Sequence, residues 1–149
     1  MKKKKGKKKA TVKVKDFDSM TVSQIMEKEV QYVRLRTKGD VIASLMIEGF
    51  GAVPVLENGR KLTGIVSEHD LLGAVDDGYP LGTVAAKDIM TANPYSVRPE
   101  MTLGTLVHVL RASDLVRVPV VNAKEKLIGI IARRDLLRAY LATGGKREQ

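Results

Sequence analysis

Three side chains with ligating or reactive groups stand within four positions of the sequence, at Ser67, His69 and Asp70. A serine followed three residues later by an acidic residue is typical of a helix N-terminus, where each side chain accepts a hydrogen bond from the other residue's backbone amide. Ser67 does not stand in the Gly-x-Ser-x-Gly sequence of an acyl-transfer nucleophile. Taken alone, the pair predicts a capping box, and His69 an exposed residue of the first helical turn.

The remaining sequence offers no catalytic constellation. It contains no cysteine, which excludes disulfides, thiolate metal sites and cysteine nucleophiles and fits a reducing compartment. The two histidines, His69 and His108, lack the His-Glu-x-x-His spacing, and there is no Gly-x-x-x-x-Gly-Lys-Ser/Thr phosphate loop. Asp76 and Asp77 lie in a stretch with glycine and proline, which is typical of a solvated loop. We therefore predict that the protein is not an enzyme and holds no metal.

The segment that contains Ser67 belongs to an internal repeat, a feature that decides the architecture of a chain when it is present. Four segments recur in the same order, which indicates a duplication rather than chance composition. The matched segments are 64–72 with 129–137, 61–62 with 126–127 and 53–55 with 118–120, all 65 residues apart, and 25–26 with 89–90, 64 residues apart.

Each copy predicts the same order of elements. A helical turn with an Ile-Met pair comes first, then a brief strand, an amphipathic helix with apolar residues at helical spacing, two apolar strands and a final helix. The Ile-Met pairs are interpreted as a stripe that packs between the copies. The predicted segments are 22–26 and 86–90 for the turns, 32–35 and 95–98 for the brief strands, 41–46 and 103–110 for the amphipathic helices, 51–56 and 61–66 for the strands of copy one, and final helices that begin near Ser67 and Ala132.

Local residues of the strands carry two further predictions. Asn58-Gly59 predicts a tight hairpin turn, because both residues tolerate positive φ. Pro54 and Pro119 predict edge strands, because proline cannot donate to a ladder. A unit of about 60 residues buries little surface alone, so we expect the two copies to pack on each other and leave a cleft between them.

The net charge of +9 is concentrated at the N-terminus. Residues 1–15 contain nine lysines and no acidic residue, whereas residues 16–149 contain 17 basic and 17 acidic side chains. The folded part is therefore predicted to lack the strongly basic surface of a nucleic-acid-binding domain. The lysine arm is predicted to be flexible, with non-specific attraction of nucleic acid through Lys2–Lys9. No apolar run approaches the roughly 20 residues of a membrane span.

The duplicated Ile-Met start, the Val-Pro-Val strand and the Gly-h-h-Ser/Thr-x-x-Asp turn (h, hydrophobic) resemble the cystathionine-β-synthase (CBS) domain pair, also called the Bateman module. The resemblance covers about residues 20–142. It implies an α+β fold, a tandem pair of βαββα units packed about a pseudo-two-fold axis, homodimerisation, and an adenosine-containing ligand bound between the repeats. The predicted organisation is a disordered lysine-rich arm (1–15), CBS repeat 1 (16–80), CBS repeat 2 (81–143) and a flexible C-terminal tail (144–149).

The resemblance also implies a ligand site. In the family, the Ser or Thr and the Asp of the turn hydrogen-bond the ligand's ribose, and a carboxylate suits this role because it accepts from both hydroxyls of a cis-diol. A cation before the Val-Pro-Val strand is directed at phosphates, a role that Arg117 matches, although a solvated surface arginine is the alternative. Tyr95 is either a wall for the base or an ordinary strand aromatic. The predicted site consists of Gly64, which lets the backbone approach the ligand, Ile65, Ser67, His69, Asp70, Pro94, Tyr95 and Arg117.

The second copy departs from the family pattern. Ala132 replaces the Ser or Thr, and Ala52 stands where the cation of the second cleft would be. The residues left for a weaker second site are Ile130, Arg133 and Asp135. We therefore predict one competent ligand site per chain and one degraded site.

These observations predict a non-catalytic sensor that binds AMP, ADP or ATP and responds by shifting its repeats or subunits, a change that an unknown protein target detects. S-adenosylmethionine is less favoured, because it has no phosphate for Arg117 and carries a sulfonium cation. The alternatives are a CBS-pair dimerisation scaffold whose basic arm binds nucleic acid or another polyanion, and a structural module with decayed sites. No segment resembles a secretory signal, which predicts a cytoplasmic protein.

Overall fold

A computed structural model describes residues 15–49 and 51–144 of the chain. These residues form two compact units, and each unit combines separate stretches of sequence. Unit 1 contains the stretch up to Lys28 with residues 97–120 and 129–144, and unit 2 contains residues 29–96 and 121–128. Both units mix helices with short strands, which confirms the predicted α+β class. Residues 1–14 of the lysine arm and 145–149 of the tail lie outside the described residues.

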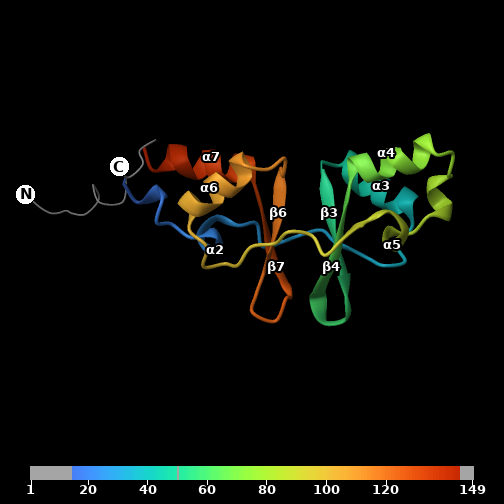
Figure 1. Cartoon of the computed structure of the whole chain (residues 1–149), viewed down its shortest axis with the longest axis horizontal. Helices are drawn as coiled ribbons and strands as arrows, with labels where there is room; N and C mark the ends of the chain where they lie inside the picture. The colour runs from blue at the N-terminus through green and yellow to red at the C-terminus, as the bar shows by residue number, and fades with distance from the viewer. Residues whose placement is uncertain (1–14, 50, 145–149) are drawn as a thin grey trace, which may run out of the picture. The chain divides into compact units, whose positions relative to one another are not determined.

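Unit 2 is built on a four-stranded sheet with the order β2-β3-β4-β5. The long central hairpin consists of β3 (Ala52–Glu57) and the antiparallel β4 (Lys61–Ser67). The short β2 (Val33–Arg34) pairs in parallel with β3, and β5 (Thr91–Ala92) pairs antiparallel with β4. Figure 1 shows the central hairpin in green, with the helices of this unit gathered at one end of it.

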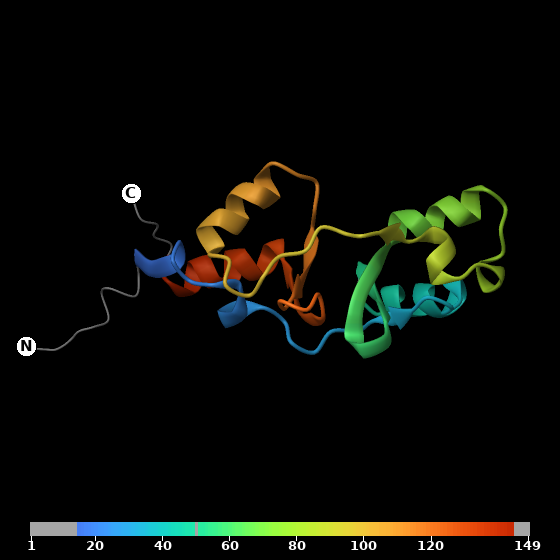
Figure 2. The ribbon, with the colours of Figure 1, turned by 60° about the horizontal axis from the view of Figure 1, so that its bottom comes forward.

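The helices of unit 2 cover the sheet because they carry apolar faces. They are α3 (Gly39–Ile47), α4 (Glu68–Asp76) and the single turn α5 (Ala86–Ile89), which follows the 3-10 turn η3 (Leu81–Thr83). Figure 2 shows α3 and α4 beside the hairpin from a second direction. Ile42 and Met46 of α3 and Leu71 of α4 are buried in one cluster with Val53, Val55 and Val66 of the strands.

Unit 1 repeats the arrangement with a two-stranded sheet. It contains η1 (Lys15–Phe17), α2 (Val22–Ile25), α6 (Leu103–Arg111), β6 (Arg117–Val121), β7 (Leu127–Ala132) and α7 (Arg133–Ala142), while the tip of the β6–β7 hairpin belongs to unit 2. Leu103, Leu106 and Leu110 of α6 are buried, as the helical spacing predicts. The ring of Phe17 packs edge-on against Tyr140, with the centroids 5.4 Å apart. None of the helices in the described ranges has both the length and the apolar composition that crossing a bilayer requires.

The hairpin predicted at Asn58-Gly59 is confirmed, although positive φ falls at Gly59 (71°) and Arg60 (68°) rather than at Asn58. Two other local predictions are wrong. Residues 95–98 do not form a strand: Val97 makes only an isolated parallel bridge with Val120. Pro54 does not lie on an edge strand, because β3 has neighbours on both sides; the β2 ladder begins only at Val55, however, so no hydrogen bond is required of Pro54 on that side.

The opening helix of each repeat packs in the compact unit that holds the strands of the other repeat. In unit 2, the Met90 side chain that follows α5 lies against Gly64 of β4. In unit 1, the Met26 side chain that follows α2 lies against Gly129 of β7. The two methionines therefore pack between the repeats, as the Ile-Met pairs predict, and each occupies the space that a glycine leaves open.

Candidate functional site

Ser67 and Asp70 lie at the junction of β4 and α4, where the sequence predicts them to cap a helix. The Ser67 N–H donates to Asp70 Oδ2 (2.8 Å), and the Asp70 N–H donates to Ser67 Oγ (3.2 Å), so the predicted capping box is confirmed. Both residues are half-buried. In the described part of the chain, Asp70 Oδ1 and the Ser67 hydroxyl proton have no hydrogen-bond partner. One carboxylate oxygen and one donor are therefore free to meet a ligand.

At several helices of this protein, the backbone amide of the N-cap residue donates to the side chain of the third helical residue. The amides of Thr21, Ala85 and Ala132 donate in the same way to Gln24, Asp88 and Asp135, at 2.8, 2.9 and 2.8 Å. An aspartate at this position is therefore no specific sign of a ligand site. At α4, however, the N-cap side chain takes part as well. The Ser67 hydroxyl accepts from the Asp70 amide, whereas Ala85 and Ala132 have no hydroxyl for this bond.

A cavity of about 560 Å³ opens beside Asp70 within unit 2. It lies between α4, the η3 turn and α5, which the backbone bonds Gly39 N–H to Val84 O (2.9 Å) and Ala86 N–H to Thr37 O (2.8 Å) hold against the start of α3. Two of the predicted site residues, His69 and Asp70, line it. The full lining is His69, Asp70, Gly73, Ala74, Asp77, Tyr79, Thr83, Val84, Asp88 and Ile89.

Sequence reasoning missed most of this lining. Asp77, Tyr79 and Thr83 belong to the connection between the repeats, which was interpreted as solvated loop, and Asp88 belongs to a short helix without an evident role. These residues share one feature: they are polar or acidic and lie in the η3 turn or on either side of it. Only the folded chain brings them to the same cavity. The described residues contain no group of three or more His, Asp or Glu side chains that could hold a metal ion.

The other residues predicted for the first site divide between the two units. Ile65 is half-buried on β4, Pro94 is half-buried after β5, and Tyr95 is 46% exposed, all in unit 2. Arg117 is half-buried at the start of β6, in unit 1. Its approach to Ser67 and Asp70 stays a prediction.

Gly64 has a packing role that sequence reasoning did not anticipate. A Cβ at this position would overlap Met90 Sδ and lie 2.9 Å from Met90 Cγ and 3.0 Å from Thr91 O. Met90 and the Thr91 carbonyl therefore favour glycine at this position, whether or not a ligand approaches the strand. Gly129 stands in the same relation to Met26, with Glu27 O 3.0 Å from its Cβ position.

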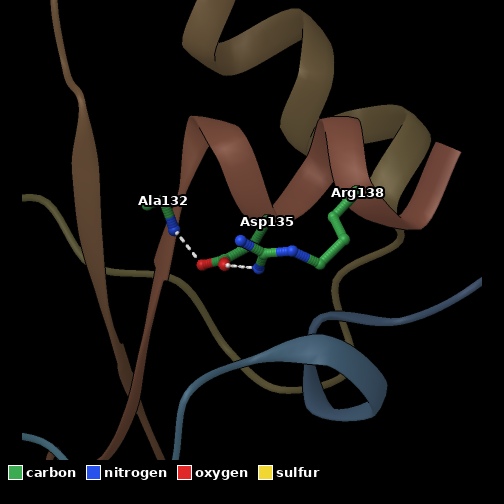
Figure 3. A network of polar contacts seen from close by, with 3 residues as sticks. All are labelled: Ala132, Asp135 and Arg138. Atoms are coloured by element: carbon green, nitrogen blue, oxygen red, sulfur yellow. Dashed lines mark hydrogen bonds and ion pairs between the residues drawn. The ribbon is translucent and has the colours of Figure 1, made fainter. Parts of the chain in front are cut away.

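The weaker second site differs from the first in the engagement of its carboxylate. Asp135 Oδ2 accepts from the Ala132 amide, and Asp135 Oδ1 accepts from Arg138 Nη1 at 3.1 Å, so both oxygens are in use (Figure 3). Arg133 is also occupied, because its Nε donates to Leu115 O at 2.7 Å. The Ile130 side chain is buried, and its backbone exchanges both hydrogen bonds with Glu27.

A second cavity, of about 470 Å³, lies between α6 and α7 in unit 1. Arg133 contributes to it, but Asp135 and Ile130 do not. The rest of the lining is largely apolar and consists of Val107, Leu110, Arg111, Ser113, Leu136 and Leu137. Asp70 thus lines the cavity of unit 2, whereas Asp135 does not line the cavity of unit 1.

Comparisons with known proteins agree with the repeat. A family model described as the CBS domain matches residues 22–77 and 86–142. An uncharacterised protein of Methanocaldococcus jannaschii is 33% identical over 126 residues, and the match covers 83% of this chain and 45% of that protein's length. The CBS-pair protein CBSX2 of Arabidopsis thaliana, solved in complex with AMP, shares 30% identity and a TM-score of 0.76, over 84% of this chain and 98% of that one. A CBS domain pair solved with 5′-methylthioadenosine and S-adenosyl-L-methionine, at 19% identity and a TM-score of 0.73 over 83% of this chain and 97% of that one, shows the same fold.

Proposed function

Because the chain belongs to the CBS-domain family, we propose that it is a non-catalytic regulatory module that binds an adenine nucleotide at Ser67 and Asp70. The proposal rests on how the carboxylate oxygens of Asp70 and Asp135 are hydrogen-bonded. Asp70 uses one carboxylate oxygen for the helix cap and keeps the other free, whereas Asp135 uses both. A carboxylate held rigidly by its own helix, with one oxygen free, is preorganised to accept from a ribose hydroxyl.

An adenine nucleotide is the favoured ligand class for two reasons. CBSX2, whose solved chain the match covers to 98%, was solved with AMP. Arg117 would pair with a phosphate and repel the sulfonium of S-adenosylmethionine, because guanidinium forms charge-assisted bonds with phosphate oxygens. Binding would act on a target protein by favouring one arrangement of the module over another.

Calorimetric titration of the full chain with AMP, ADP, ATP, GTP and S-adenosylmethionine tests the proposal. A salt concentration of about 0.3 M shortens the Debye length below 10 Å and suppresses attraction of phosphates to the lysine arm. We expect saturable binding of adenine nucleotides, near one per chain, with GTP and S-adenosylmethionine much weaker. Absence of binding by every ligand would instead favour the dimerisation scaffold.

We further propose that unit 2 mediates homodimerisation through α3 and α4. Ile47 is 85% exposed on α3, and Leu72 is 64% exposed on α4. Val41 and Val75 on the same two helices are also exposed. If these side chains adjoin on the two helices, they form an exposed apolar patch of the kind that marks association surfaces.

Leu72→Glu is expected to convert a dimer into a monomer, because it places a charge in an apolar contact, which is costly to desolvate. Sedimentation velocity or light scattering measures the mass. Val116→Glu is the matched control, since Val116 is 59% exposed but lies in unit 1 outside these helices. A Leu72→Glu protein with the mass of the unaltered chain would contradict the proposed interface.

A further inference from the structure

Tyr32 stands just before β2 with two guanidinium groups over its ring. The Cζ atom of Arg34 lies 5.8 Å from the ring centroid, and the Cζ atom of Arg60 lies 5.3 Å from it. Cation–π contacts at these distances attract both guanidinium groups to the face of the ring. The ring therefore serves as a platform that fixes two cations at one edge of the sheet.

Arg60 also joins Tyr32 to the second hairpin tip of unit 2. Its Nε donates to Leu127 O at 3.2 Å, and it is held at a φ of 68°, which few arginines adopt. Beside it, the Leu62 N–H donates to Glu125 O at 3.2 Å. Strained backbone that is fixed by long-range bonds in this way is found more often at functional positions than elsewhere.

The two hairpin tips place lysine opposite lysine. Lys61 and Lys126 form an isolated antiparallel bridge, an arrangement in which like charges destabilise the pair. The Lys126 Nζ atom lies 3.9 Å from the Cβ position of Gly59, so its charge stays near the turn that carries Arg60. A polyanion bound across both tips would remove this repulsion.

We define the hairpin-tip patch as Tyr32 with Arg34, Arg60, Lys61, Lys124 and Lys126. In the part of the chain that the structure describes, none of these five cations forms an ion pair. The neighbouring Glu57 is directed elsewhere, because its Oε2 accepts from Thr63 Oγ1 at 2.6 Å. Glu125 also lies at the second tip, between Lys124 and Lys126, so the five cations stand beside two acidic side chains. The acidic side chains that line the cavity of unit 2 belong to α4, α5 and the connection between them.

We propose that the hairpin-tip patch binds the phosphate backbone of single-stranded nucleic acid. Guanidinium groups form bidentate bonds with phosphate oxygens, and the two beside Tyr32 are joined by three exposed lysines that add positive charge. The outer guanidinium planes are also surfaces on which unstacked bases stack. An acidic peptide is the less favoured ligand, because it carries negative charge but has no planar bases to stack on the guanidinium groups.

The patch does not depend on the nucleotide site, and it modifies the view that the folded part has no basic surface. The balance of 17 basic and 17 acidic side chains over residues 16–149 holds. Neutral totals, however, do not exclude local separation of charge, and it is the local field that attracts a polyanion.

Fluorescence anisotropy with a labelled oligouridylate of about 16 nucleotides tests the proposal. The full chain is compared with Lys61→Gln/Lys126→Gln across a salt series. Each phosphate contact contributes about 0.7 to the slope of log affinity against log salt, so loss of two contacts should reduce the slope by about 1.4. The variant should fold at least as well as the parent, because it removes a like-charge pair, and thermal melts verify this.

Lys87→Gln/Arg134→Gln is the matched control, since both residues are exposed cations outside the patch. The control should keep the slope of the parent, and a chain without Lys2–Lys9 should still bind and still respond to the patch variant. An unchanged slope in Lys61→Gln/Lys126→Gln, or complete loss of binding when Lys2–Lys9 are removed, overturns the proposal. So does polyglutamate that displaces the oligonucleotide at an equal concentration of charge.

Discussion

Replacing Gly64 with alanine is expected to lower the free energy of unfolding by about 2 kcal/mol, the range of overpacking in a filled core. The new Cβ would overlap Met90 Sδ and approach Thr91 O to 3.0 Å. The methionine side chain can move, but the Thr91 carbonyl belongs to β5, which pairs with β4 at this position. The substitution therefore forces the two strands apart, and chemical denaturation measures the cost.

Two other glycines provide controls for this result. Gly129→Ala should cost a similar amount, because Gly129 meets Met26 and Glu27 O in the same way. Gly73→Ala should stabilise by up to about 1 kcal/mol, because Gly73 lies inside α4 with no atom within 4 Å of its Cβ position. A Gly64→Ala protein that keeps its stability but loses nucleotide would show that glycine is needed for a ligand and not for Met90.

Asp70→Asn is expected to weaken the adenine nucleotide by roughly thirtyfold, which corresponds to about 2 kcal/mol for one hydrogen bond to a charged group. Asparagine keeps an oxygen that can accept from the Ser67 amide, so the cap of α4 is retained. The free oxygen is replaced by an amide NH2 group, which is a donor, so the ribose contact loses its charged acceptor. Calorimetric titration gives the affinity, and a thermal melt confirms that the cap is intact.

Asp135→Asn is the matched variant in the second repeat. Asp135 accepts from its own N-cap amide in the same way, but its second oxygen already binds Arg138. Nucleotide affinity should therefore stay within about twofold of the parent value. Equal losses in both variants would contradict the prediction of one competent site per chain, and no loss in Asp70→Asn would contradict the proposed function.

The elements that depend on local pattern were predictable from sequence. The apolar spacing of Leu103, Leu106 and Leu110 placed α6, and the Ser67–Asp70 pair placed the start of α4, because both signals lie within one or two helical turns. The interior position of Pro54 was not predictable, since it follows from a parallel pairing with residues 33–34 that only the fold creates. The turn at Asn58–Arg60 was predicted, but not the positive φ of Arg60 or the bond of its side chain to Leu127, 67 positions away.

The candidate site also contains features that the sequence predicts and features that only the fold reveals. The roles of Ser67 and Asp70 in capping were visible in the sequence, whereas the partner of Gly64 was not, since Met90 lies 26 positions further along the chain. Asp77, Tyr79 and Asp88 were overlooked because a cavity is a property of three elements together. The ring contacts of Tyr32 could not be predicted either, because Arg60 comes from the β3–β4 hairpin, 28 positions further along the chain.

The opening helix of each repeat packs with the strands of the other repeat, and this arrangement has a consequence for synthesis on the ribosome. Unit 2 receives its last strand, β5, and the Met90 side chain only when residues 90–92 have emerged, although most of its core comes earlier. A nascent chain of 80 residues would therefore present β4 as an open edge, and such edges recruit strands from other molecules. At about 5–20 residues per second this interval is short, but a product truncated between the repeats would remain in that state. Expression of the first repeat alone is therefore expected to leave that edge of β4 without β5.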